Sequence, residues 1–109
     1  MVQRVSIIRQ FSDYLSAKNY PTNLKVMKKE INFEEDLEDS TQKMAICLDI
    51  ENDKYIGRFI VWEDNSCFLE MMKFDTAQTV IHKRVDFQTK EVLISIYDCF
   101  IQDFSKPQL

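Results

Sequence analysis

Glycine and proline are scarce in this 109-residue chain, which has one glycine, Gly57, and two prolines. Loops that cradle phosphates need several glycines close together, so the composition excludes a nucleotide-binding loop of that type. The scarcity also favours short connections between secondary-structure elements over long flexible linkers. We therefore expect one domain over residues 1–109, a size that can bury a single hydrophobic core.

Histidine and cysteine are also few, with one histidine and three cysteines. A nucleophile needs a base beside it, and His82 lies in a strand-like segment where an exposed position is the simplest interpretation. Cys47, Cys67 and Cys99 are widely spaced and lack the C-x-x-C pattern of zinc sites. Their apolar surroundings are typical of buried, reduced thiols. The sequence thus predicts no catalytic residue, no metal and no cofactor.

Positive charge is in short supply, since 14 lysines and arginines face 18 acidic residues and the net charge is −4. Nucleic-acid binding requires basic residues that neutralise phosphates, so this balance argues against it. The short basic clusters at Lys25, Lys28 and Lys29 and at residues 82–84 fit solvated strand faces. No apolar run approaches the roughly 20 residues that cross a bilayer, and the N-terminus lacks a secretory signal. We expect a cytoplasmic protein without membrane contact.

The spacing of apolar residues predicts one amphipathic helix near each end of the chain. In residues 4–18 these residues recur at intervals of three and four. Asn19 in a left-handed conformation, followed by Pro21, should end this helix. Thr89 has the side chain of an N-cap, and Glu91 favours the helix dipole. The helix after Thr89 is the most regular, with an apolar face of Leu93, Ile96, Tyr97, Phe100, Ile101 and Phe104.

Between the helices the pattern alternates as in β-strands. Residues 24–33 fit a strand but also a short helix. Further strands are expected at residues 43–51, with Met44, Ile46, Leu48 and Ile50 inward, at 55–63, at 67–74, with apolar Phe68, Met72 and Phe74, and at 79–87. Short turns at residues 52–53, 64–65 and 75–77 favour a meander, and Asp64-Asn65 suits a turn with positive φ. The predicted fold class is α+β: an N-terminal helix, an antiparallel meander sheet of four to five strands, and a C-terminal helix packed on the sheet.

The strand at residues 55–63 is apolar on both faces. Such a strand is either covered on both sides or leaves one face for a partner. Gly57 indicates a bulge or a close approach by another element. Trp62 fits a core residue or an interface anchor, and both interpretations stay open.

The most acidic segment, residues 34–42, predicts an exposed loop because like charges this dense resist packing. It lacks the ligand pattern of a calcium loop, and solvated carboxylates have no desolvation to raise a pKa. It is either a solvating loop or an acidic face for a basic partner such as a nuclease. The candidate partner-binding residues are Glu34, Glu35, Asp36, Glu38, Asp39, Trp62 and Glu63.

The segment from residue 55 to residue 104 resembles TriTu-type immunity proteins, which are encoded beside polymorphic or contact-dependent toxins of bacteria. Gly57, Trp62 and Glu63 match most closely, although the chain has Asp64-Asn65 where the family pattern has a glycine. The resemblance rests on the runs Ile56-Gly57-Arg58-Phe59-Ile60-Val61-Trp62-Glu63, Phe68-Leu69-Glu70, Asp75-Thr76, Val80-Ile81-His82-Lys83 and Thr89-Lys90-Glu91.

The resemblance implies an antitoxin that binds the C-terminal domain of a cognate toxin, with a nuclease as one candidate, and blocks it without catalysis. Such a protein would act as a monomer or a homodimer. An acidic secretion chaperone that binds an effector is the alternative, because it is also small and α+β. Those chaperones carry a helix between their strand groups, and residues 43–87 show no such pattern. A catalytic or ligand-binding barrel would need polar groups on the inward strand faces, which are apolar here.

Overall fold

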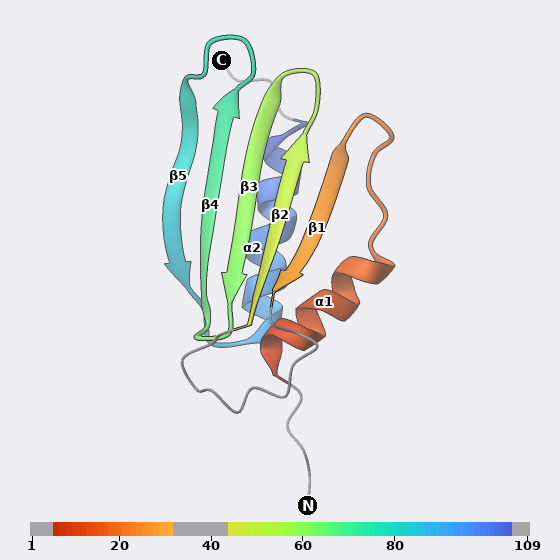
Figure 1. The fold of residues 1–109 in the computed structure, drawn as a ribbon, viewed down its shortest axis with the longest axis vertical. Helices are drawn as coiled ribbons and strands as arrows, with labels where there is room; N and C mark the ends of the chain where they lie inside the picture. Colours follow the sequence, from red (N-terminus) through yellow and green to blue (C-terminus); the bar gives the residue numbers. More distant parts are fainter. Residues whose placement is uncertain (1–5, 32–43, 106–109) are drawn as a thin grey trace, which may run out of the picture.

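The structure is a computed structural model that describes residues 6–31 and 44–105. In these residues a helix is followed by five strands and a second helix (Figure 1). The elements are α1 (Ile7–Ala17), β1 (Lys25–Ile31), β2 (Ala45–Glu51), β3 (Tyr55–Trp62), β4 (Ser66–Lys73), β5 (Thr79–Asp86) and α2 (Lys90–Asp103). The strands form one sheet in the order β1-β2-β3-β4-β5, with every neighbouring pair antiparallel. The predicted α+β meander is confirmed.

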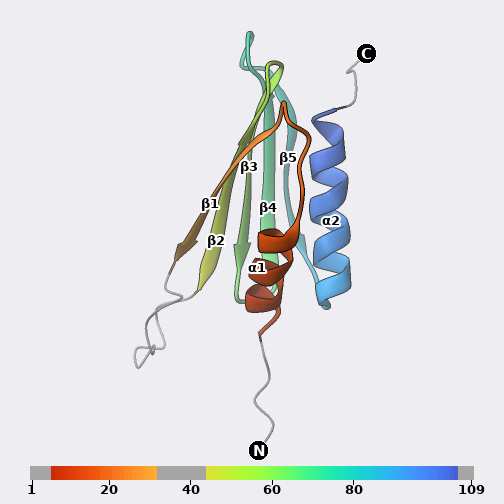
Figure 2. The ribbon, with the colours of Figure 1, turned by 90° about the vertical axis from the view of Figure 1, so that its right-hand side faces the viewer.

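Both helices lie on the same face of the sheet (Figure 2). Between them and the sheet is the core, in which the Phe59 ring of β3 meets aromatic rings from both helices. Its ring centroid lies 6.1 Å from that of Phe11 on α1, 4.9 Å from that of Tyr97 and 5.7 Å from that of Phe100 on α2. All four side chains are at most 1% exposed. Burying aromatic side chains of this size contributes much of the favourable free energy of folding.

The predicted inward face of β2 is confirmed, since Met44, Ile46, Leu48 and Ile50 are all buried. In β4 the structure buries the other set of residues. Its register pairs Leu69 with Phe59, which turns Cys67, Leu69 and Met71 toward the helices. Phe68 and Met72 therefore point to the opposite face, and Phe74, just past the strand, is 62% exposed.

Helix α1 begins at Ile7, where the Ser6 side chain accepts a hydrogen bond from the Arg9 N–H at 3.4 Å. It ends without the predicted left-handed Asn19, because the cap residue Lys18 is extended. Within the described residues only Asn65 and Ala77 have positive φ among the non-glycine residues. The positive φ predicted for the Asp64-Asn65 turn is thus confirmed at Asn65, whereas the left-handed helix end was wrong.

Tertiary contacts explain how α1 ends. The Lys18 ammonium lies 3.1 Å from the Asp98 carboxylate of α2, which also accepts a 2.6 Å hydrogen bond from the Tyr14 hydroxyl. Beyond the cap, the hydroxyls of Tyr20 and Tyr97 lie 2.8 Å apart. Because the chain leaves α1 in an extended conformation, Tyr20 can reach α2. Contacts with α2 therefore set the direction of the chain after α1. At α2 the predicted N-cap is confirmed, with the Thr89 side chain accepting from the Val92 N–H at 3.2 Å.

Gly57 marks a close approach by α2, one of its two predicted roles. A Cβ at this position would lie 2.5 Å from Cζ of Phe104, 2.9 Å from the Glu70 carbonyl oxygen and 3.2 Å from Cζ of Phe100. The pairing of β3 with β2 and β4 is regular through this residue. The absence of a side chain therefore lets the C-terminal turn of α2 sit against the sheet.

We predict that Gly57→Ala lowers the free energy of unfolding by about 1–3 kcal/mol, the usual cost of overpacking a core. Chemical denaturation measures this loss. The ring of Phe104 makes the shortest contact, so adding Phe104→Leu should recover part of it, and the two substitutions should be clearly non-additive. Strictly additive effects would mean that the methyl group and the Phe104 ring do not compete for the same space.

Candidate protein-binding face

The face of the sheet opposite the helices, here called the open face, has no described element over it (Figure 2). The alternation of the strands assigns its side chains, and the register places Ile56 opposite Met72 and Ile60 opposite Phe68. Met27 is 63% exposed and Ile56 39% exposed, which are large values for apolar side chains. The apolar members are Met27, Ile31, Ile56, Ile60, Trp62, Phe68 and Met72.

The open face answers the question raised by the two-sided apolar pattern of β3. One side of that strand forms the core with the helices, and the other lies on the surface. Monomeric proteins rarely expose large contiguous apolar patches, and such patches mark interaction sites. This face is also enriched in methionine, aromatic and arginine residues, the types that are common at the centres of protein interfaces.

Trp62 lies on the open face and is half-buried, so the core interpretation is wrong. The Arg84 guanidinium stacks 5.3 Å from the centre of its ring. Arg84 is held there by a 3.1 Å hydrogen bond that its Nη2 donates to Ser66 Oγ. Because Arg84 already holds its position on the Trp62 ring, these two side chains lose little conformational entropy when a partner binds.

Glu63, the other candidate beside the turn, has a structural role in this fold. Its Oε1 accepts a 3.1 Å hydrogen bond from the Met44 N–H, and its own N–H donates to the Met44 carbonyl at 3.0 Å. These contacts close the end of the β2–β3 pair. Glu34, Glu35, Asp36, Glu38 and Asp39 belong to the connection between β1 and β2 and lie outside the described residues.

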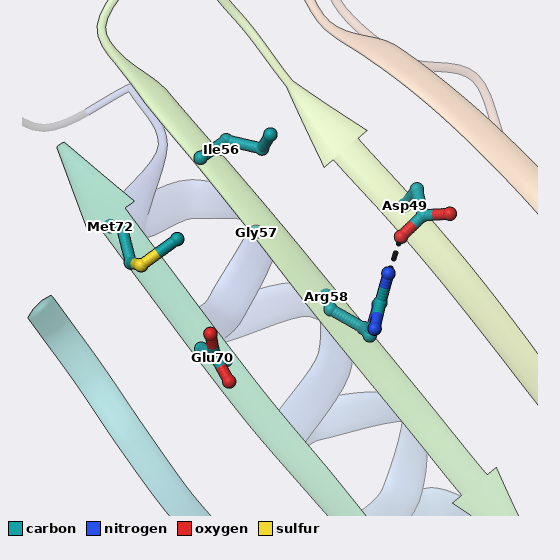
Figure 3. Close-up of a pocket in the computed structure, with 6 residues that line it drawn as sticks. All are labelled: Asp49, Ile56, Gly57, Arg58, Glu70 and Met72. Atoms are coloured by element: carbon teal, nitrogen blue, oxygen red, sulfur yellow. Dashed lines mark hydrogen bonds and ion pairs between the residues drawn. The ribbon is translucent and has the colours of Figure 1, made fainter. Parts of the chain in front are cut away.

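Charged side chains on the open face mostly pair with one another. The Arg58 Nε donates to Asp49 Oδ1 at 3.0 Å, and Lys25 and Glu51 lie 4.0 Å apart. Figure 3 shows Arg58 pointing toward Asp49 on β2 and away from Glu70 on β4. Within residues 6–31 and 44–105 no hydrogen bond or ion pair reaches the half-buried Glu70 carboxylate.

Two shallow hollows lie side by side on this face and share Asp49, Ile56 and Arg58. One has a volume of about 280 Å³ and is lined by Asp49, Ile56, Gly57, Arg58, Glu70 and Met72 (Figure 3). The other, of about 240 Å³, is lined by Lys25, Met27, Asp49, Ile50, Glu51, Ile56 and Arg58. Both fall below the roughly 300–1,000 Å³ of small-molecule pockets, so they suit side chains of a protein partner better than a cofactor.

The histidine and cysteines do not converge on a site. His82 is exposed, as predicted, and its ring packs edge-on to Phe68 with centroids 5.2 Å apart. Cys67 is buried, which raises the pKa of its thiol to about 11. Burial was wrong for Cys99, which is exposed on α2 and lines a hollow between that helix and β5, and Cys47 is only half-buried on the open face. Across the described ranges, no three His, Cys, Asp or Glu side chains could together hold a metal ion.

None of the helices in the described residues is long and apolar enough to span a membrane. Fold and face together define a two-layer α+β protein with a surface suited to protein contact. Residues 10–103 match the model of the family described as Immunity protein TriTu, so the chain belongs to this family of immunity proteins. The match includes most of α1 and all of β1, beyond the segment from residue 55 onward that carried the sequence resemblance. No curated protein is similar enough to count as a match.

Sequence reasoning missed most of the open face. Of its side chains it proposed only Trp62, and it left out Ile56, Glu70 and Met72. The alternation within β3 carries a signal, because Ile56, Ile60 and Trp62 share one face. That signal does not say which face the helices cover, and the partners of these residues on β4 depend on register.

Proposed function

We propose that the chain binds the C-terminal domain of a cognate bacterial toxin and blocks it stoichiometrically, without chemistry of its own. The open face makes the contact. The observation that carries this proposal is an apolar sheet face that no described element covers, in a chain that belongs to a family of immunity proteins. An inhibitor of this kind needs a rigid, complementary surface, and catalytic groups would add nothing.

The construction of the face supports this role. Its side chains project from five hydrogen-bonded strands backed by a packed core, so few degrees of freedom are lost on binding. Exposed apolar side chains at its centre contribute affinity, while the ion pairs around them contribute orientation. Trp62, stacked under Arg84, is of the residue type most often found at energetic hot spots.

The acidic residues 34–39 would contribute mainly to the rate of association. Five carboxylates in a connection between adjacent strands attract a basic partner over a distance, and salt screens this attraction. A nuclease domain has a basic cleft for its phosphate substrate, so it fits such a partner. The complex would form in the cytoplasm, where a nuclease toxin finds its substrate.

The first test is protection of growth. A protein that co-purifies with the tagged chain from its bacterial host is expressed alone and together with this chain. We expect its C-terminal domain to stop growth alone and to be harmless with the chain, through a one-to-one complex. An unrelated small acidic protein serves as the control. A captured protein that is harmless alone, or that stays toxic in the presence of the chain, would contradict the proposal.

The second prediction separates the two faces of the molecule. Ile56→Asp puts a charge on the central strand of the open face and should raise the Kd for the toxin domain by about thirtyfold or more. Val92→Asp is the matched control, because Val92 on α2 is 46% exposed and Ile56 39%. It should leave binding unchanged, and calorimetry measures both. Equal losses would show that the open face is not the contact surface.

The wild-type cysteines provide an independent footprint of the same contact. Cys47 lies on the open face and Cys99 on α2, on the helix side of the sheet. Saturating toxin domain should slow the alkylation of Cys47 by iodoacetamide and leave that of Cys99 unchanged, as followed by mass spectrometry. Protection of Cys99 instead would assign the contact to the helices.

The third prediction concerns the acidic segment. Reversing Glu35, Asp36, Glu38 and Asp39 to lysine should slow association by about tenfold or more at low salt and flatten its salt dependence. Stopped-flow mixing measures both effects. The control reverses four exposed acids elsewhere, so that the net charge changes equally: Asp13, Asp53, Asp75 and Glu91. An association rate that responds equally to both sets would assign the effect to net charge rather than to this segment.

A further inference from the structure

Glu70 is a charged group on the open face with which no described residue forms a hydrogen bond or ion pair. The register places it between Arg58 on β3 and His82 on β5. Arg58 instead donates its Nε to Asp49, and its side chain points away from β4 (Figure 3). His82 packs its ring against Phe68, and across the described residues neither it nor any other group forms a hydrogen bond or ion pair with the Glu70 carboxylate.

The surroundings of this carboxylate carry an excess of negative charge. The hollow beside it contains two carboxylates, those of Asp49 and Glu70, and one guanidinium, that of Arg58. Arg58 is already compensated by Asp49, so a partner carboxylate placed here would meet Glu70 without a free cation to balance it. A cation from the partner would instead pair with Glu70, while Arg58 stays paired with Asp49, so that each carboxylate has one cation. Charge complementarity therefore favours a cationic group.

The walls of the hollow fit the rest of a basic side chain. Ile56 and Met72 lie opposite each other across β3 and β4 and border the hollow on its apolar side. Lysine and arginine carry aliphatic stems that pack along apolar surface while the charged head stays beside polar groups. A volume of about 280 Å³ has room for one such side chain.

Covering the open face makes a hydrogen-bonding partner for Glu70 necessary. A half-buried carboxylate that loses its remaining water without gaining a partner destabilises the complex. A toxin domain that packs on Ile56 and Met72 would remove that water, because Glu70 lines the same hollow. Only a partner that supplies hydrogen-bond donors, and best a positive charge, avoids the cost. Glu70 thus discriminates between toxin domains according to the group placed over it.

We propose that the hollow beside Glu70 is a recognition site for a lysine or arginine side chain of the toxin domain. The cation pairs with the Glu70 carboxylate and its aliphatic stem packs on Ile56 and Met72. This proposal rests on the proposed function, because it assumes that the toxin covers the open face. Beyond that function, it states which kind of side chain on the toxin domain makes the contact, and that Glu70 selects it.

The test uses the full chain and the toxin domain identified by the growth-protection experiment. Glu70→Gln keeps the shape but removes the charge and should raise Kd by about tenfold, and Glu70→Lys should raise it by about a hundredfold. Asp13→Lys is the charge-matched control, because Asp13 is exposed on α1 and away from the open face, and it should change Kd by less than about threefold. Lysines and arginines of the toxin are then reversed to glutamate one at a time. One of these reversals should restore binding to the Glu70→Lys chain.

The outcomes separate this proposal from the proposed function. If wild-type chain protects and binds but the Glu70 variants bind equally well, the recognition site is wrong and the immunity function stands. If the Glu70 variants lose binding and no basic residue of the toxin restores it, Glu70 does not meet a cation and the proposal also fails. Rescue by a single lysine or arginine reversal supports it. If the wild-type chain binds no toxin, both proposals fall together.

Discussion

The packing of aromatic rings around Phe59 is the interaction on which the rest of this molecule depends. Phe11 from one helix and Tyr97 and Phe100 from the other converge on this ring in the middle of the central strand. Gly57, two residues away on the same side of β3, lets the C-terminal turn of α2 approach the sheet. Because both helices are committed to one face, no described element covers the other, and the apolar residues there stay at the surface.

This division gives each face a different chemistry. On the helix side polar groups are satisfied, as where the Asp98 carboxylate is bound by Tyr14 and Lys18. On the open side apolar residues alternate with ion pairs, and Glu70 forms no hydrogen bond or ion pair with the described residues. Stability is thus concentrated between sheet and helices, while the open side is left for binding. A sheet whose strands are fixed by their core can present such a surface without rearranging.

The sequence predicted the elements better than it predicted the surface. Apolar spacing identified both helices, and alternation identified the strands, because these periods follow from local backbone geometry. The predictions that failed depended on contacts between distant residues. Lys18 adopts an extended cap because Tyr20 and Lys18 contact α2, and β4 buries Leu69 because its register sets it beside Phe59. Neither contact is visible in a local pattern.

The sequence by itself determined the order of the elements, the turn at Asn65, the cap at Thr89 and the family resemblance centred on residues 55–104. It also determined that β3 is apolar on both faces. Only the tertiary structure decided which of those faces is open, that Trp62 lies on it under Arg84, and that Arg58 pairs with Asp49 and not with Glu70. The physical reason is that alternation divides the residues of a strand between two faces but does not determine which face the helices cover. Their roles follow from where the helices pack and how neighbouring strands are registered, which are properties of the whole chain.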